Sequence, residues 1–480
     1  MPQQQIPLVY GDGRNRKNLD YVTLFPVNMT PIARPIKDAN GYMRSFPGLT
    51  KIKDTDGVSR GVNWNTVQQL PYRVMGGYLY KDSTQMGAVP NSGRVSMAHS
   101  RITVAVATGG ILYLHNYDGT ISQFSNWPIT GQPTDVTFDW GNVFDVTRVR
   151  QRYIFSQQDS DTFWISSLED ESHPDRVAPF YRAESMPDGI LALRSWRDYV
   201  VCFGSSTIEF FALTGDASQV YQSQPSYMIR QGIVGQFTVC NYLESFAFIS
   251  SPANGSVSVM LMEASGGTAS DLANYQVKEI LAKYTVDQLS TSVLESIEIA
   301  SSKFLIMHLP EETLCYDVVA SQALGIQAWS ILKTGITGSA GSDVYRGIDL
   351  CNHGDRISCG DRRIGQMANL DKTVSSQYGE DQEMILYTPL LYAPNMIVSE
   401  FEVDSSLGDE NNPIKNLFLS GTEDGINYGQ EKLVKYDSKL KWLGRTLWQR
   451  IGRIRTCFGL KIRAVGSAPV TMSKARVRID

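Results

Sequence analysis

The residues with the most obvious chemical potential form an acidic stretch with one imidazole, residues 169–176. Its sequence, Glu-Asp-Glu-Ser-His-Pro-Asp-Arg, offers carboxylate oxygens and a ring nitrogen, which are common ligands of metal ions. A metal site needs ligands that converge from a fixed scaffold, whereas adjacent residues point their side chains in different directions. We therefore expect a solvated loop here, with no metal and no cofactor.

Two other short motifs match catalytic or metal-binding patterns only in part. Residues 54–57 (Asp-Thr-Asp-Gly) begin like a calcium loop, but an acidic position is missing and Asn65 stands where a bidentate Glu is needed. Residues 204–208 lack the second Gly of a nucleophile elbow. With five His residues in the chain, few bases could activate a Ser or Cys nucleophile. These motifs predict turns, and we expect a protein that is not an enzyme.

One enzyme class stays open as an alternative. Residues 420–428 (Ser-Gly-Thr-Glu-Asp-Gly-Ile-Asn-Tyr) loosely resemble the Asp-box hairpin of sialidases, although the spacing is off by one residue. That box is itself structural, because its Asp and Gly form a tight turn. Glycoside hydrolysis also needs two carboxyl groups about 5 to 9 Å apart, and 49 acidic residues neither identify nor exclude such a pair. A carbohydrate-binding or glycosidase module is therefore the second hypothesis.

The elements that would position such residues are predicted to be short β-hairpins. A short apolar alternating run, a turn of Gly, Asn or Asp, and a second apolar run recur along the chain. The spacing of roughly 45 to 55 residues is typical of propeller blades. We predict a mainly β protein with a β-propeller-like domain of repeated hairpins, and keep a pair of stacked sheets as the structural alternative. The predicted hairpins cover residues 72–80, 102–114, 153–165, 199–211, 246–262, 304–316 and 347–359.

Outside the hairpins the pattern changes twice. Residues 285–298 carry apolar side chains at helical spacing and are the best candidate for a helix. Residues 458–464 and 476–479 alternate apolar and basic side chains, which predicts half-buried strands, and a Pro-containing strand is expected at residues 387–389. The predicted organisation is an extended segment at 1–60, the propeller-like domain at 61–382, and a basic β-sandwich at 383–480.

Charge is distributed unevenly along the chain. The net charge of −5 argues against a general nucleic-acid-binding surface. The segment after Gln430, however, holds thirteen Lys and Arg against three acidic residues. We predict that this basic surface contacts an acidic surface of a neighbouring subunit or another partner. The candidate contact residues are Arg450, Arg453, Arg455, Lys461 and Arg463.

The tryptophans, the cysteines and the length of the apolar runs indicate which residues form the core and in which compartment the chain is made. Trp164, Trp196 and Trp448 lie in or beside alternating apolar runs and are predicted core residues. The six Cys residues are scattered, mostly within apolar runs, which favours a reducing compartment. No basic patch followed by an apolar run begins the sequence, and no run of about 18 apolar residues occurs, so we expect synthesis in a cytoplasm without membrane insertion.

Several long ordered strings resemble one phage family, the packaged-DNA stabilisation protein or tail accessory factor of short-tailed phages. They include NGYMRSFPGLT at 40–50, CFGSSTIE at 202–209 and LWQRIGRIR at 447–455. None of these strings has catalytic meaning, and together they span nearly the whole chain. The other matching strings lie at residues 93–99, 168–176, 181–185, 196–198, 343–347 and 424–429.

The resemblance implies a structural role in the virion tail, with assembly in the host cytoplasm. Members of the family form a hexameric ring below the portal and its adaptor, or head-completion, protein. They continue the DNA channel, retain the packaged DNA, and carry the tail needle and the tailspikes. For this chain we therefore expect these partners, with residues 1–60 docking the adaptor, no sequence-specific DNA binding and no cofactor.

Overall fold

The computed structural model describes residues 4–6, 8–9, 24–35, 39–124, 142–186, 188–251, 255–392, 394–407, 416–435 and 444–480. Strands dominate, which confirms the predicted mainly β class. The chain divides into two compact units. One comprises residues 1–51, 297–346 and 368–480, and the other comprises residues 52–296 and 347–367.

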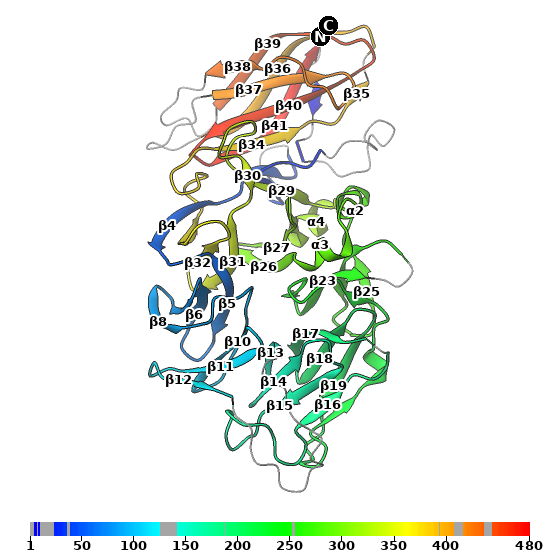
Figure 1. The fold of residues 1–480 in the computed structure, drawn as a ribbon. Helices are drawn as coiled ribbons and strands as arrows, with labels where there is room; N and C mark the ends of the chain where they lie inside the picture. The colour runs from blue at the N-terminus through cyan, green and yellow to red at the C-terminus, as the bar shows by residue number, and fades with distance from the viewer. Residues whose placement is uncertain are drawn as a thin grey trace. The chain divides into compact units, whose positions relative to one another are not determined.

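Seven of the nine sheets in the described residues follow one another along the chain and are numbered here as blades 1 to 7 (Figure 1). Each has four or five strands. Blade 1 holds β5 (Ser59–Asn65), β6 (Leu70–Met75), β7 (Tyr78–Lys81) and β8 (Thr84–Ala88); blade 2 holds β9 (Ser96–His99), β10 (Thr103–Thr108), β11 (Ile111–Asn116) and β12 (Ile121–Gln123). Blade 3 holds β13 (Val143–Val149), β14 (Arg152–Gln157), β15 (Thr162–Ile165) and β16 (Phe180–Arg182); blade 4 holds β17 (Ile190–Trp196), β18 (Tyr199–Gly204), β19 (Ile208–Leu213) and β20 (Tyr221–Ser223).

The last three blades depart from four consecutive strands. Blade 5 holds β21 (Gly232–Ile233), β22 (Val239–Tyr242), β23 (Ser245–Ser251), β24 (Ser258–Met262) and β25 (Ala269–Asp271). Blade 6 holds β26 (Val293–Ile299), β27 (Ser302–His308), β28 (Thr313–Asp317), β29 (Trp329–Thr334) and β30 (Asp343–Val344). Blade 7 holds β31 (Gly347–His353), β32 (Arg356–Asp361) and β33 (Gln366–Asp371), and is completed by β4 (Gly48–Asp54) from near the start of the chain.

All seven predicted hairpins are present, one in each blade. In the first of them Met75 pairs with Tyr78 around a two-residue turn. Gly76 has a φ of 53° there, and a Cβ on it would lie 2.9 Å from the Cα of Gly57. The position therefore needs glycine both for its backbone conformation and for the close approach of a second turn.

Apolar side chains fill the space between neighbouring blades. Trp164 lies in the cluster shared by blades 2 and 3, and Trp196 in the cluster shared by blades 4 and 5. Both indoles are buried, and the Nε1 atom of Trp196 donates to the carbonyl of Glu244 at 3.0 Å. The prediction that these two tryptophans are core residues is confirmed.

Within the described residues, short helices interrupt the strands at three places. They are α2 (Tyr275–Leu281), α3 (Val286–Ser290) and α4 (Val318–Leu324), with a 3-10 turn η1 (Pro225–Tyr227). The helix predicted over residues 285–298 is correct only in its first turn. A capping box between Thr285 and Gln288 starts α3, but residues 293–299 form β26. Val293 and Leu294 fit the helical period by coincidence, because both are buried in a strand.

The remaining two sheets form a sandwich. One contains β2 (Met29–Ile32), β3 (Tyr42–Ser45), β41 (Val470–Ile479), β36 (Ile397–Leu407) and β39 (Gly444–Arg453), with β1 (Gln4–Ile6) paired to β41. The other contains β34 (Gln382–Tyr387), β40 (Cys457–Gly466), β37 (Asn416–Thr422) and β38 (Lys432–Lys435), with β35 (Leu391–Tyr392) paired to β40. β40 and β41 alternate buried and partly exposed side chains as predicted.

Two expectations about this region differ from the structure. The strand predicted at residues 387–389 ends at Tyr387, since Pro389 has no N–H to donate to a neighbouring strand. The described parts of residues 1–60 are not one extended arm. They supply β1 to β3 to the sandwich, β4 to blade 7 and the start of β5 to blade 1, because β1 and β3 pair with β41, and β4 pairs with β33, far along the chain. The domain limits at 60/61 and 382/383 stay predictions.

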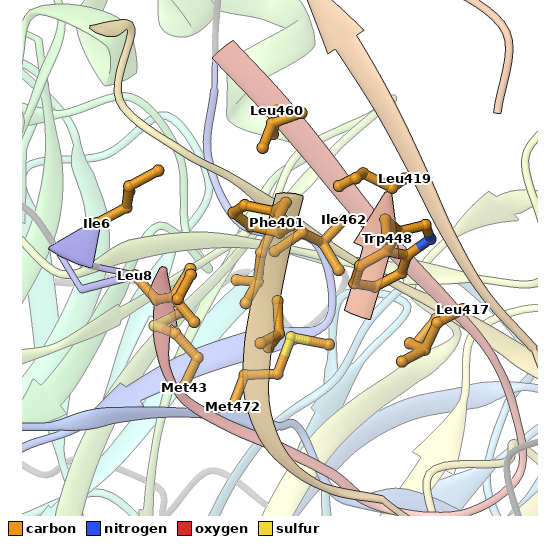
Figure 2. Packing of buried hydrophobic residues seen from close by; sticks show 14 of the residues in the cluster. Ile6, Leu8, Met43, Phe401, Leu417, Leu419, Trp448, Leu460, Ile462 and Met472 are labelled. Atoms are coloured by element: carbon orange, nitrogen blue, oxygen red, sulfur yellow. The ribbon is translucent and has the colours of Figure 1, made fainter. Parts of the chain in front are cut away.

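The sandwich core is a single apolar cluster between its sheets. Figure 2 shows Phe401 and Trp448 facing Leu417, Leu419 and residues of β40. Residues from the start of the chain join the same cluster, which gives the two termini one shared core. The labelled members are Ile6, Leu8, Met43, Phe401, Leu417, Leu419, Trp448, Leu460, Ile462 and Met472.

Replacing Trp448 by Ala should lower the free energy of unfolding by about 3 to 5 kcal/mol. The indole is 2% exposed, lies 6.0 Å from the ring of Phe401 and donates from Nε1 to the carbonyl of Lys432 at 3.0 Å. Urea denaturation of the purified variant measures the loss. Trp64, which is only partly buried, is the matched control, and an equal loss for both variants would contradict the assignment.

Candidate binding surfaces

The acidic stretch at residues 169–176 is used structurally by its own surroundings. Asp175 forms an ion pair with Arg152 at 2.6 Å and accepts the N–H groups of Val177 and Ala178. Burial alone would raise the pKa of Asp175, but these N–H groups and Arg152 outweigh it and lower that pKa. Glu171 accepts the hydroxyls of Ser100 and Thr103 at 2.7 and 2.6 Å. The carboxylates therefore fix the loop to blades 2 and 3.

The calcium-like motif at residues 54–57 lies where β4 ends and β5 is about to begin. The carboxylate of Asp54 accepts the side-chain amide of Gln366 at 3.0 Å, an interaction with blade 7. Across the described ranges, no group of three or more His, Cys, Asp or Glu side chains is placed to hold a metal ion.

The motif resembling an Asp box is a turn after β37 in the sandwich. One oxygen of Asp424 accepts the N–H groups of Ile426 and Asn427 at 2.8 and 2.7 Å, and Gly425 has a φ of 79°. These N–H groups lower the pKa of Asp424. The carboxylate is committed to the turn, as the structural interpretation of the motif requires.

One strand from each blade lines a central cavity of about 870 Å³. Its lining comes from β5, β9, β13, β17, β22, β26 and β31, one strand from each blade, which is the arrangement of a β-propeller. Four arginines line it, Arg94, Arg148, Arg150 and Arg194, against the two acids Glu295 and Asp349. The cavity is thus polar and carries more basic than acidic side chains.

Hydrogen bonds beside this cavity join every blade to the next. A side chain takes part in each of them, so the ring of blades is closed by polar contacts as well as by apolar packing. In blade order the bonds are Asn63 to the Met97 carbonyl at 3.3 Å, Ser96 to the Val146 carbonyl at 3.1 Å, the Leu193 N–H to Asp145 at 2.7 Å, Arg194 to the Gln236 carbonyl at 3.2 Å, Ser296 to the Asn241 carbonyl at 2.6 Å, the Leu350 N–H to Glu295 at 2.7 Å, and Ser59 to Asp349 at 2.7 Å.

Two buried aspartates hold the arginines of this ring in place. Asp145 is fully buried and pairs with Arg194 at 3.0 Å, while its other oxygen accepts the hydroxyl of Ser96. Asp349 pairs with Arg94. Burial alone would raise the pKa of Asp349, but the charges of Arg94 and Arg73 outweigh it and lower that pKa. Sequence reasoning missed these aspartates because their partners lie tens to hundreds of residues away.

Of the five predicted basic contact residues, three are exposed on one edge of the sandwich. Arg450, Arg453 and Arg455 lie on or just after β39, which is the edge strand of its sheet. Arg450 has a φ of 54° at a bulge, and the ammonium group of Lys432 donates to its carbonyl. No carboxylate in the described part of the chain forms an ion pair with these three arginines.

The other two predicted contact residues are already paired within the sandwich. Arg463 forms an ion pair with Glu431 at 2.5 Å, and Lys461 lies 3.6 Å from the same carboxylate. Arg463 also lies 4.0 Å from Glu383, which is fully buried and pairs with Lys333 at 3.1 Å. The basic residues of β41 likewise face acidic residues of β36. The unpaired basic surface is therefore narrower than the sequence pattern indicated.

No helix within the described residues is both long and apolar enough to cross a membrane.

Comparison with solved structures finds propellers at low similarity. The β-propeller domain of Nup133 from Vanderwaltozyma polyspora is 8% identical, with 70% of this chain and 98% of that chain covered and a TM-score of 0.41. An exo-β-1,3-galactanase from Phanerochaete chrysosporium is 10% identical, with 80% of this chain and 95% of that chain covered and a TM-score of 0.29.

Comparison of sequences is far more specific. A family described as "Bacteriophage P22 Gp10, beta-propeller" matches residues 4–375, and one described as "Bacteriophage P22 Gp10, beta-sandwich" matches residues 383–480. The tail hub protein gp10 of Salmonella phage P22 is 44% identical over 483 residues, which cover 100% of both chains. With its propeller, its sandwich and this full-length match, the chain belongs to the phage P22 gp10 family.

Proposed function

We propose that this chain is a tail hub protein of a short-tailed phage, with a structural and not an enzymatic role. The observation that carries the proposal is the 44% identity to a tail hub protein across the propeller and the sandwich alike. A match over the whole length of both chains supports a shared role more strongly than a common fold does, because a fold alone says little about function.

In this role the chain forms a hexameric ring in the virion tail, below the portal and its adaptor protein, after assembly in the host cytoplasm. The ring continues the DNA channel, retains the packaged DNA, and docks the tail needle and the tailspikes. Residues 1–60 take part in docking the adaptor. Steric closure requires no tight DNA binding, which agrees with a net charge of −5.

Sizing the purified chain alone and with a purified portal–adaptor complex tests the proposal. We expect the chain to join the complex and to raise its mass by several copies. A chain that ignores the adaptor complex and instead releases sugar from host polysaccharide would support the glycosidase alternative and overturn the proposal. The two assays use the same preparation, so a misfolded sample fails both and is recognised by circular dichroism.

We propose that the edge of β39 is one contact of this assembly, through Arg450, Arg453 and Arg455. Edge strands present unpaired backbone groups, and here the exposed arginines and the bulge discourage random strand pairing while leaving a basic surface for a specific acidic partner. Lys461 and Arg463 support this surface from the neighbouring sheet, with Glu431 holding both cations.

Replacing Arg450, Arg453 and Arg455 together by Ser should weaken assembly on the adaptor complex, and the difference from the unchanged protein should shrink as salt is raised. Exposed charges attract over about 10 Å at 0.1 M ionic strength and over about 3 Å at 1 M. Analytical ultracentrifugation at both ionic strengths measures the effect. The matched control replaces Arg182, Arg230 and Arg356, three exposed arginines of the propeller. Unchanged assembly of the β39 variant at both ionic strengths would rule out the contact.

A further inference from the structure

A second cavity, of about 800 Å³, lies beside the central cavity and shares Thr66, Arg148 and Arg150 with it. We call it the face groove. Turns and strand ends of blades 1 to 4 line it, so it crosses the propeller face where β5 and β13 end. The residues used below are Val67, Arg101, Arg148, Arg150, Leu168 and Leu213.

Three aliphatic side chains of the face groove are exposed. Val67, Leu168 and Leu213 are 46%, 59% and 38% exposed, and they come from three different blades. Single exposed aliphatic residues are ordinary, but several around one concave surface mark an interaction site. Covering them removes apolar surface from water, which favours binding at about 25 cal/mol for each Å².

Two arginines of the face groove, Arg101 and Arg148, form no ion pair with any carboxylate of the described residues. The guanidinium of Arg148 donates to the carbonyl of His99 at 3.0 Å, but its Nε–H is buried and has no hydrogen-bond partner in the part of the chain that the structure describes. In contrast Arg152, also in the lining, pairs with Asp175, and Arg150 pairs with Asp198.

His99, whose backbone carbonyl accepts from Arg148, adds no charge beside that arginine. Its Nε2 accepts the N–H of Thr66 at 3.2 Å, which leaves the proton on Nδ1, facing the side-chain oxygen of Asn63 at 2.7 Å. Burial and the charge of Arg148 lower the pKa of His99. The imidazole is therefore neutral, and the positive charge of Arg148 at the mouth of the central cavity remains available.

We propose that the face groove binds an extended segment of another protein in which acidic and aliphatic side chains alternate. Carboxylates pair with Arg148 and Arg101, and aliphatic side chains cover Val67, Leu168 and Leu213. In an extended segment successive side chains point to opposite sides, so the two types reach different parts of the lining. The inference uses only this lining and does not depend on the tail hub proposal.

Nucleic acid fits the face groove less well. A phosphate backbone would leave the three aliphatic side chains without apolar partners. Asp198 and Asp216 also line the groove and would repel a continuous row of phosphates. A peptide can place its few carboxylates beside the arginines alone.

The test measures fluorescence anisotropy of a labelled 12-residue peptide in which Glu and Leu alternate, with the full-length chain. We expect this peptide to bind saturably. A matched peptide with Gln in place of Glu, and a 12-nucleotide single-stranded DNA, should not bind. Arg148→Gln should weaken binding by about tenfold, the size of one charge-assisted hydrogen bond. Leu168→Glu should weaken it similarly by adding a like charge at an exposed position that folding does not need. Arg230→Gln, at an exposed arginine between η1 and β21, is the control and should bind as the unchanged protein does.

Several results would overturn the proposal. The first is that the Glu-Leu peptide does not bind at about 1 mM, a concentration that detects even weak sites. The second is that the Gln-Leu peptide binds as tightly as the Glu-Leu peptide. The third is that all three variants bind the Glu-Leu peptide with equal affinity. Preferential binding of the DNA, lost in Arg148→Gln, would assign the groove to nucleic acid instead. Because Leu168 is exposed, its variant keeps the test decisive even if Arg148→Gln destabilises the fold.

Discussion

Particles assembled without this chain should fill with DNA to the normal amount and then lose it, and they should lack needle and tailspikes. Duplex DNA carries one negative charge per roughly 1.7 Å, so closely packed turns repel one another and push the genome toward any opening. If the chain closes the channel as proposed, filling does not require it but retention does. DNA content followed over time by density-gradient sedimentation, with electron microscopy of the tails, measures both effects.

Adding the purified chain to freshly filled particles is the control for this experiment, and it should restore retention. Particles without the chain that kept their DNA as long as complete virions, in the same buffer, would show that another component closes the channel. The tail hub location and the retention role are thus tested separately, since the missing needle and tailspikes report only on the location.

Replacing Asp145 by Ala should lower the free energy of unfolding by about 3 to 5 kcal/mol, the typical result of removing one partner of a buried ion pair. Asp145 is fully buried and accepts hydrogen bonds from Ser96 of blade 2 and from Leu193 and Arg194 of blade 4, so its loss removes the acceptor of three hydrogen bonds and leaves Arg194 without its buried carboxylate. Urea denaturation measures the change, and proteolysis should cut first within blades 2 to 4.

The matched control for Asp145 is Asp198→Ala. Asp198 also pairs with an arginine, Arg150, at 2.5 Å, but both side chains are more than half exposed. Water and salt screen such a pair, so its loss should change the free energy of unfolding by less than about 1 kcal/mol. If the two variants were equally stable, the aspartate between the blades would have no special part in closing the ring.

The local elements of this fold could be predicted from sequence because their signals are local. Each blade hairpin joins two apolar strands through a turn of a few residues, and a turn such as Gly76-Gly77 has a recognisable composition. The tryptophans were predictable for the same reason, since each belongs to an alternating run. The half-buried strands near the end of the chain also follow from alternation alone.

The elements that could not be predicted correctly from the sequence depend on partners far away in the chain. Residues 293–299 satisfy a helical period and become β26, since pairing within blade 6 overrides local preference. β3 pairs with β41 across more than four hundred residues, so the sequence near residues 42–45 does not predict a strand of the sandwich. The ion pairs of the sandwich also depend on distant partners. The sequence showed the basic residues of β40, but their partners Glu383 and Glu431 could be identified only in the fold.

The pairing of β1 with β41 sets the order of events during synthesis. Gln4 emerges from the ribosome long before its partner Val477, which follows it by more than four hundred residues. At about 5 to 20 residues per second, the first strand waits roughly 20 to 90 seconds for a place in a sheet. The blades between can fold meanwhile, but the sandwich cannot close. A chain that ends before β41 therefore lacks the strand that joins β1 and β3 to β36 in one sheet.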